Sequence, residues 1–235
     1  MITKHLSDER GRSRFDWLDS RHSFSFGQYQ DPERVQHGPL RVLNEDRVAP
    51  GAGFPTHPHR NMEILTYVLE GTLRHADSTG HEADLRAGQF QAMTAGAGLT
   101  HSEFNPSPDE PVHFLQIWIL PRQPGLRPRY ADAAPGDDPV RLLASPDGRE
   151  GSLAIAQDAH LYRLRGDARH GTFDLPAEEG ELGWLQIASG SWTLGADQLA
   201  PGDALEVRGE TGLKLTNEDP GEALWFRLPG NGPDA

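Results

Sequence analysis

The stretch Gly51-Ala-Gly-Phe-Pro-Thr-His-Pro-His59 decides the fold to expect, together with Gly96-Ala-Gly-Leu-Thr-His-Ser-Glu103. Each stretch contains a glycine turn and ends in two potential metal ligands that are one residue apart. Side chains alternate between the two faces of a strand, so both members of each pair point to the same side. Inside a β-barrel, two such strands would bring three imidazoles and one carboxylate together, a set that suits Fe, Zn, Mn, Ni or Cu. The candidate ligands are His57, His59, His101 and Glu103.

The composition limits the classes of partner and cofactor. The chain has 235 residues and a formal charge of −13, which argues against binding to nucleic-acid phosphates or anionic membranes. It has no cysteine, so disulfides, iron–sulfur clusters and thiolate metal sites are excluded. The N-terminus has no apolar signal region, and no apolar run is long enough to span a bilayer. We therefore expect a cytoplasmic protein without a membrane or a direct nucleic-acid partner.

The rest of the sequence alternates short apolar segments with turns. The 26 glycines and 19 prolines favour many turns between short strands over long helices. Residues 112–120 form the most apolar run, which predicts a central core strand. Phe24 and Phe26 alternate with polar residues and predict a further strand over 22–26. This pattern is typical of an all-β protein.

The chain divides into two similar halves. Five prolines between residues 121 and 139 predict a connector between an N-terminal barrel, residues 1–125, and a C-terminal barrel, residues 126–235. A weak internal repeat relates the halves through glycine-turn motifs. At the positions of the four candidate ligands the second half has no second ligand set, so we expect one metal per chain. The aligned residues are Pro176, Glu178, Leu215 and Asn217.

These residues resemble known motifs. Gly51-x5-His57-x-His59-x3-Glu63 and Gly98-x2-His101-x3-Asn105 resemble the two cupin motifs, although Gly96 replaces the usual proline. More specifically, the chain resembles the pirin family, and its second half resembles bacterial pirin-like quercetin 2,3-dioxygenases. The matching stretches are Ser23-Phe-Ser-Phe-Gly27, Leu40-Arg-Val-Leu-Asn-Glu-Asp46, His57-Pro-His-Arg-Asn-Met-Glu-Ile-Leu-Thr-Tyr67, Leu69-Glu-Gly71, Met93-Thr-Ala-Gly96 and His101-Ser-Glu103.

The resemblance implies a bicupin: two jelly-roll β-barrels in tandem, with few short helices and one mononuclear metal in the first barrel. It implies that His57, His59, His101 and Glu103 are the ligands. In ordinary cupins a glutamate of the first motif is a ligand, which here would be Glu63. We follow the pirin assignment, and we expect iron as the first choice of metal, with Ni, Mn, Cu and Zn as alternatives.

The resemblance also implies a reaction. We expect a metal-dependent dioxygenase that uses O2 to cleave a flavonol such as quercetin to a depside and carbon monoxide, with Glu103 as general base. The alternative is a non-enzymatic metal or redox sensor that binds a protein partner involved in transcription or metabolism. A third hypothesis is isomerisation or hydrolysis at the same site. A small aromatic substrate and O2 are the expected partners, and we expect a monomer.

Other residues receive a structural interpretation first. His75 and Asp77 share a face and are expected to be structural. His113 is expected either to orient a ligand or to pack in the core. Glu63, if it is not a ligand, is expected beside the metal or in a buried ion pair. The candidates for lining an aromatic pocket are Met62, Met93, Phe54 and Phe90.

Overall fold

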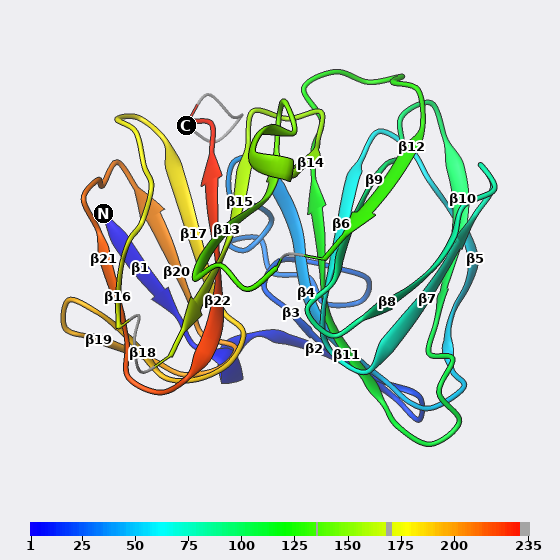
Figure 1. Cartoon of the computed structure of the whole chain (residues 1–235), viewed down its shortest axis with the longest axis horizontal. Coiled ribbons are helices and arrows are strands. Elements are labelled where there is room, and N and C mark those ends of the chain that lie inside the picture. The colour runs from blue at the N-terminus through cyan, green and yellow to red at the C-terminus, as the bar shows by residue number, and fades with distance from the viewer. Residues whose placement is uncertain (135, 168–170, 231–235) are drawn as a thin grey trace.

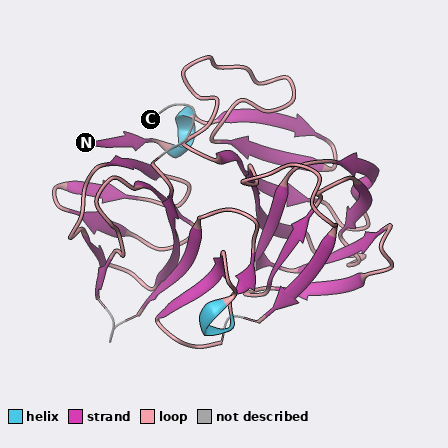
Figure 2. Cartoon of the chain, turned by 90° about the horizontal axis from the view of Figure 1, so that it is seen from above, coloured by secondary structure: helices cyan, strands magenta, loops and turns pink. Residues whose placement is uncertain are grey.

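Two β-barrels stand side by side in the computed structural model, which describes residues 1–134, 136–167 and 171–230 (Figure 1). Each barrel combines a seven-stranded sheet with a four-stranded sheet. Within the described ranges the helical segments are two single 3-10 turns, η1 (Ser7–Glu9) and η2 (Arg149–Gly151) (Figure 2). The prediction of an all-β protein with few short helices is confirmed. No helix in these ranges is long and apolar enough to cross a membrane.

The first barrel holds the two sequence stretches with the candidate ligands. In spatial order its larger sheet consists of β12 (Arg129–Ala133), β9 (Phe90–Thr94), β6 (Glu63–Glu70), β11 (Val112–Ile119), β4 (Leu40–Val48), β3 (Leu18–His22) and β2 (Gly11–Phe15). Its smaller sheet consists of β5 (Gly53–His59), β10 (Leu99–Phe104), β7 (Thr72–Asp77) and β8 (Glu82–Arg86).

The second barrel repeats this architecture. Its larger sheet consists of β1 (Ile2–His5), β20 (Ala204–Arg208), β17 (Leu182–Ile187), β22 (Gly221–Leu228), β15 (His160–Gly166), β13 (Val140–Ser145) and β14 (Leu153–Ala154). Its smaller sheet consists of β16 (Thr172–Asp174), β21 (Lys214–Asn217), β18 (Trp192–Leu194) and β19 (Asp197–Leu199).

Central strands of the two larger sheets, such as β6, β11 and β17, are buried on both faces, which explains their largely apolar sequences. In β11, Leu115 and Ile117 belong to a core cluster that also contains Leu224 and Phe226 of the second barrel, so this cluster lies between the barrels. Gln116 lies between Leu115 and Ile117 on β11. Because side chains alternate along a strand, it points to the inside of the first barrel. On these strands, every second side chain therefore packs between the two barrels, and the side chains in between line the interior of their own barrel.

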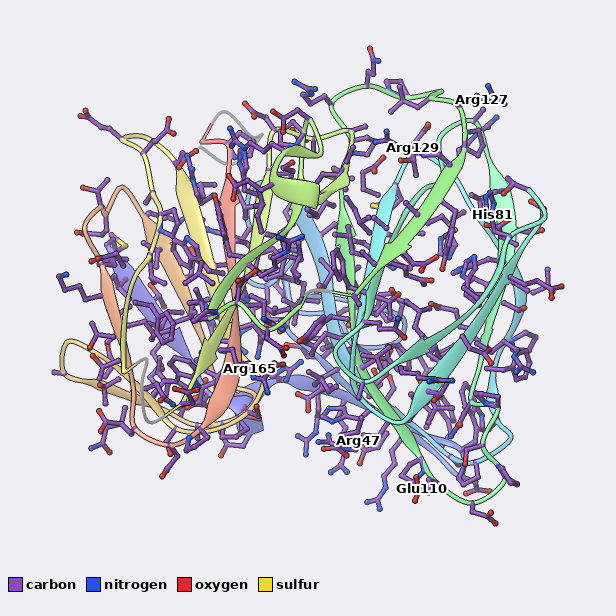
Figure 3. The ribbon with its side chains drawn as sticks, in the orientation of Figure 1. Arg47, His81, Glu110, Arg127, Arg129 and Arg165 are labelled. Carbon is purple, nitrogen blue, oxygen red and sulfur yellow. The ribbon has the colours of Figure 1, made fainter. Side chains whose placement is uncertain are left out.

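The strands are not divided between the barrels in the order of the sequence. β1, at the beginning of the sequence, pairs with β20 in the second barrel, and β12 pairs with β9 in the first (Figure 1). The connector predicted for 121–139 therefore contains a strand of the first barrel; residue 135 lies outside the described ranges. Arg129 on β12 bonds Thr94 of the first barrel and the carbonyl oxygen of Ala154 in the second (Figure 3). The sheets thus do not divide at residue 125, and the limits 1–125 and 126–235 remain a prediction.

The strand predicted for residues 22–26 is wrong. β3 ends at His22, and the chain then turns away, because the backbone amide of Ser25 bonds the carbonyl oxygen of Arg34. Phe24 is buried between the barrels, whereas Phe26 pairs with Tyr29 in a tight loop. The alternation came from two phenylalanines with different surroundings, since Phe24 packs in the core between the barrels and Phe26 lines a cavity of the first barrel, rather than from one sheet face.

Candidate metal centre

The four predicted ligands lie on two neighbouring antiparallel strands of the small sheet. His57 and His59 are on β5, His101 and Glu103 are on β10, and His101 is paired directly with His57. The pairing shifts by one residue between His101 and Glu103, which is a β-bulge. A Cβ atom at Gly53 would collide with the backbone of Glu103, so this close approach of the strands requires glycine.

Three imidazoles converge as predicted. The Nε2 atoms of His57 and His101 are 3.1 Å apart, and the rings of His57 and His59 have centroids 4.8 Å apart. One ligand atom from each of His57, His59 and His101 lies within 4.8 Å of the others. This spacing surrounds a point that one metal ion can occupy.

The protonation states also fit a metal. Nδ1 of His57 lies 2.8 Å from the carbonyl oxygen of Pro55, which only accepts, so Nδ1 donates and Nε2 keeps its lone pair. Burial, reinforced by the neighbouring histidines, lowers the pKa of His59 to about 4 and that of His101 to about 3. Near neutral pH these two rings are uncharged, as metal ligation requires.

Glu103 is held separately. Its side chain is buried and accepts hydrogen bonds from Gln116 at 2.7 Å and Gln91 at 3.2 Å. Burial, with the charge of Asp46 next in weight, raises the pKa of Glu103 to about 7. The carboxyl group is thus fixed in place and titrates near neutrality.

The structure adds His75 to this neighbourhood. One ligand atom from each of His75, His101 and Glu103 lies within 4.8 Å of the others. His75 lies on β7 opposite Glu103, stacks on Tyr130 at 4.6 Å and bonds Asp77 at 3.2 Å. The sequence signal for this was the alternation of His75 and Asp77, and only the strand pairing shows that both lie opposite the candidate ligands of β10. His81, at the turn after β7, is on the exposed outer side (Figure 3).

Two other candidates lie on the opposite face. Glu63 has the same parity as Leu65, which packs between the barrels, and its carboxylate accepts a hydrogen bond from Thr94 at 2.8 Å. His113 has the parity of Leu115 and bonds Glu45 at 2.9 Å. The structure therefore places neither residue beside the histidines.

A cavity of about 740 Å³ opens beside the histidines. His57, His59 and Glu103 form part of its wall. Of the four residues predicted to line a pocket, Phe54 does so; Met62 and Met93 pack in a small cluster of their own, and Phe90 packs between the barrels. Sequence reasoning missed the other lining residues, which come from β2, β3, β4, β11 and the loop after β3. They include Trp17, Ser20, His22, Phe26, Tyr29, Asn44, Asp46, Gln116 and Trp118.

In the second barrel the corresponding interior is apolar. Leu215, aligned with His101 in the sequence, is paired with Phe173, and both pack with Trp192 in a buried cluster. In the described part of the chain, both groups with metal-ligand spacing belong to the first barrel.

Comparisons with known proteins agree with this architecture. The family model Pirin matches residues 4–119, and the model for the quercetinase C-terminal cupin domain matches residues 142–228. The chain is therefore a bicupin, as the resemblance implied. Together the two models cover most of the sequence.

Individual relatives are similar over nearly their whole length. The chain is 42% identical to quercetin 2,3-dioxygenase from Escherichia coli K12, covering 97% of this chain and 99% of the relative. It is 40% identical to a putative quercetin 2,3-dioxygenase, PA1210, from Pseudomonas aeruginosa, covering 95% and 98%. The crystal structure of the bacterial pirin YhhW from E. coli in complex with nickel(II) superposes with a TM-score of 0.91 at 40% identity, covering 97% and 99%. The chain belongs to the pirin family.

Proposed function

We propose that the protein is a metal-dependent dioxygenase that cleaves a flavonol such as quercetin with O2 to a depside and carbon monoxide. The observation that carries this proposal is the convergence of three imidazoles, two of which, His57 and His59, line a cavity of about 740 Å³. Pockets of about 300–1,000 Å³ are typical for drug-sized ligands. The relatives named quercetin 2,3-dioxygenase support the choice of substrate class.

We propose His57, His59, His101 and Glu103 as the ligands of one divalent metal. The neutral imidazoles of His59 and His101 and the clustered donor atoms of His57, His59 and His101 fit such an ion, and Glu103 has a donor atom close to that of His101. Iron remains our first choice, and Ni, Mn, Cu and Zn suit the same donors; the nickel complex of YhhW is the precedent for nickel. When bound, the metal supplies a Lewis acid that lowers the pKa of a substrate hydroxyl and stabilises its negative charge.

The side chains of the cavity perform the remaining tasks. A carboxylate oxygen of Glu103 accepts the proton of the flavonol 3-hydroxyl, and a raised pKa suits a general base that works near neutrality. Gln116 and Gln91 hold that carboxylate in position. Trp118 and Phe26 form an aromatic corner, with ring centroids 5.4 Å apart, that keeps water from the substrate.

The cavity favours this function over the alternatives. A non-enzymatic sensor that binds a protein needs no open cavity beside its metal. An isomerase or hydrolase that acts on a smaller substrate does not need a cavity of about 740 Å³. Cytoplasmic location, a monomeric state and the absence of a nucleic-acid partner remain predictions from the sequence.

The test is single-turnover gas analysis. Quercetin is added anaerobically to protein loaded with Fe, Ni, Mn or Zn, O2 is admitted, and carbon monoxide is measured. We expect about one CO per quercetin consumed with at least one of these metals. Glu103→Gln should lose this turnover, whereas the exposed, distant Asp84→Asn should keep it. Flavonol binding without CO would overturn the proposed reaction, and full activity of Glu103→Gln would overturn the role of Glu103.

A further inference from the structure

A row of polar side chains crosses the inside of the first barrel. Neighbours in this row are paired directly across five adjacent strands, from β9 through β6, β11 and β4 to β3. Polar residues at interior positions are costly unless they have partners. The β9 end of the row binds Glu103, as described above, but the β3 end has no part in holding the candidate ligands. The row consists of Gln91, Thr66, Gln116, Asn44 and His22.

The β3 end of the row is rigid. Asn44 accepts at its Oδ1 from Nδ1 of His22 at 2.8 Å, so Nε2 of His22 accepts from the hydroxyl of Ser13, also at 2.8 Å. Burial lowers the pKa of His22, which keeps the ring neutral. All three residues line the cavity. They form a polar floor under a space whose walls include several aromatic rings.

Asp46 lies beside this floor and has an unused acceptor. It also lines the cavity, and it is only 4% exposed. The Ser20 hydroxyl, on the neighbouring strand, hydrogen-bonds its carboxyl group. Its Oδ1 atom, however, has no hydrogen-bond partner among the described residues. Most buried polar atoms have such a partner, so this one calls for an explanation.

Asp46 also lacks a dedicated cation. The nearby guanidinium of Arg10 is engaged by the adjacent Glu45 at 2.7 Å and by the carbonyl oxygen of Arg21 at 3.1 Å. Within the described ranges, no ion pair is formed by Asp46, and burial raises its pKa to about 7. A fold gains nothing from such a carboxyl group, because an apolar side chain would avoid the cost of burying it. A ligand that donates a hydrogen bond would give Asp46 the partner that the protein does not supply.

The cavity walls indicate the shape of that ligand. Trp118 contacts His59 with ring centroids 4.9 Å apart and Phe26 at 5.4 Å, both edge to face. Across the lining, Trp17 and Phe54 form a second edge-to-face pair at 5.2 Å. Aromatic surfaces near a polar floor suit a planar ligand that carries a hydroxyl on its ring.

We propose that Asp46 is a specificity-determining residue whose carboxyl group accepts a hydrogen bond from a phenolic hydroxyl of the substrate other than the hydroxyl beside the histidines. This inference rests on the proposed flavonol function and narrows its substrate class to polyhydroxylated flavonols. A site that presents a buried acceptor discriminates against an analogue without the donor, because the acceptor is then left unpaired.

A pair of ligands tests this assignment. Quercetin has hydroxyls on both ring systems, whereas 3-hydroxyflavone has only the hydroxyl and carbonyl at the metal end. Dissociation constants are measured by fluorescence quenching, without O2, on the nickel-loaded full chain. We expect the wild type to bind quercetin about 10- to 100-fold more tightly than 3-hydroxyflavone, as a hydrogen bond to a buried carboxyl group would give. Asp46→Ala should reduce this ratio to about 3-fold or less through weaker quercetin binding, and Asp46→Asn should retain part of it.

The controls separate binding from folding. Nickel content and melting temperature show whether each variant keeps the metal centre and the fold, and Asp84→Asn controls for removing a carboxylate elsewhere. If Asp46→Ala does not fold, Asp46→Asn is the deciding variant. The proposal then requires that Asp46→Asn lower the preference for quercetin over 3-hydroxyflavone at least threefold. An unchanged ratio in a folded variant would overturn the role of Asp46 while the wild type still releases CO. If the wild type binds neither flavonol, the proposed function fails and this inference fails with it.

Discussion

Gln116 donates a hydrogen bond of 2.7 Å to Glu103, and this bond joins the two sheets of the first barrel at the candidate metal centre. Gln116 lies on β11 of the large sheet, and Glu103 lies on β10 of the small sheet. Thr66 donates to the side-chain oxygen of Gln116 at 3.0 Å, so the orientation of its amide is fixed. The position of the proposed base thus depends on a strand from the opposite sheet.

Gln116→Leu removes the shortest hydrogen bond to Glu103. We expect turnover to fall about 10- to 100-fold, because a hydrogen bond to a charged group contributes about 1.5–3 kcal/mol. The metal content should remain close to that of the wild type, since three imidazoles are untouched. Steady-state CO release and elemental analysis provide the measurements. Unchanged turnover would show that this bond does not position Glu103, and Gln198→Leu on β19 of the second barrel provides the matched control.

His101→Ala should abolish stable metal binding. His101 belongs to both groups with metal-ligand spacing, so its loss breaks either arrangement. Elemental analysis should give about one metal per chain for the wild type and less than about 0.1 for the variant, as loss of a ligand predicts. His81→Ala, at an exposed turn, should keep the full metal content. Two metals per wild-type chain would contradict the assignment of one metal to the first barrel.

The stability of the metal-free protein should depend on pH through Asp46. The pKa of this carboxyl group is raised from 3.8 to about 7 by burial, so the folded state favours its neutral form. The resulting stabilisation is fully present below about pH 4 and is lost as the pH rises through about 7. One pKa unit corresponds to about 1.4 kcal/mol, so the loss is at most about 4 kcal/mol.

The pKa of Glu103 is also raised to about 7 and that of His59 is lowered to about 4, and the comparison with Asp46→Asn removes their contribution. Urea unfolding at pH 4, 5.5 and 7.5 gives the free energy of unfolding of both proteins. We expect the wild type to lose stability relative to Asp46→Asn as the pH rises. A constant difference across this range would show that Asp46 is not a buried titrating group.

Leu224→Ala tests whether the two barrels unfold together. Leu224 is fully buried in the cluster between the barrels. The variant should lose about 2–5 kcal/mol of stability through the transfer of the side chain and the cavity left behind. The exposed Val140→Ala should change stability by less than about 0.5 kcal/mol. Calorimetry should show one transition in the wild type, and two well-separated transitions would contradict the shared core.

The all-β class and the candidate ligand histidines could be predicted from local pattern. His57 and His59 lie on one strand with one residue between them, and the same spacing separates His101 from Glu103. Because side chains in a strand alternate strictly, each pair was bound to share a face. The resemblance to pirins then ordered these pairs into one site. Glu63 was harder, because alternation says which residues share its face but not whether that face is the inside of a barrel.

The sequence by itself determined which residues alternate, where glycine turns separate the strands, and which donor atoms are available for a metal. Only the tertiary structure decided which face of each strand lines the cavity and which distant strands meet there. It placed His75 opposite Glu103 and β1 in the second barrel, and it left Oδ1 of Asp46 without a hydrogen-bond partner among the described residues. The physical reason is that strand pairing and sheet packing join residues far apart in the chain, and their register is set by the burial of whole faces rather than by local propensity.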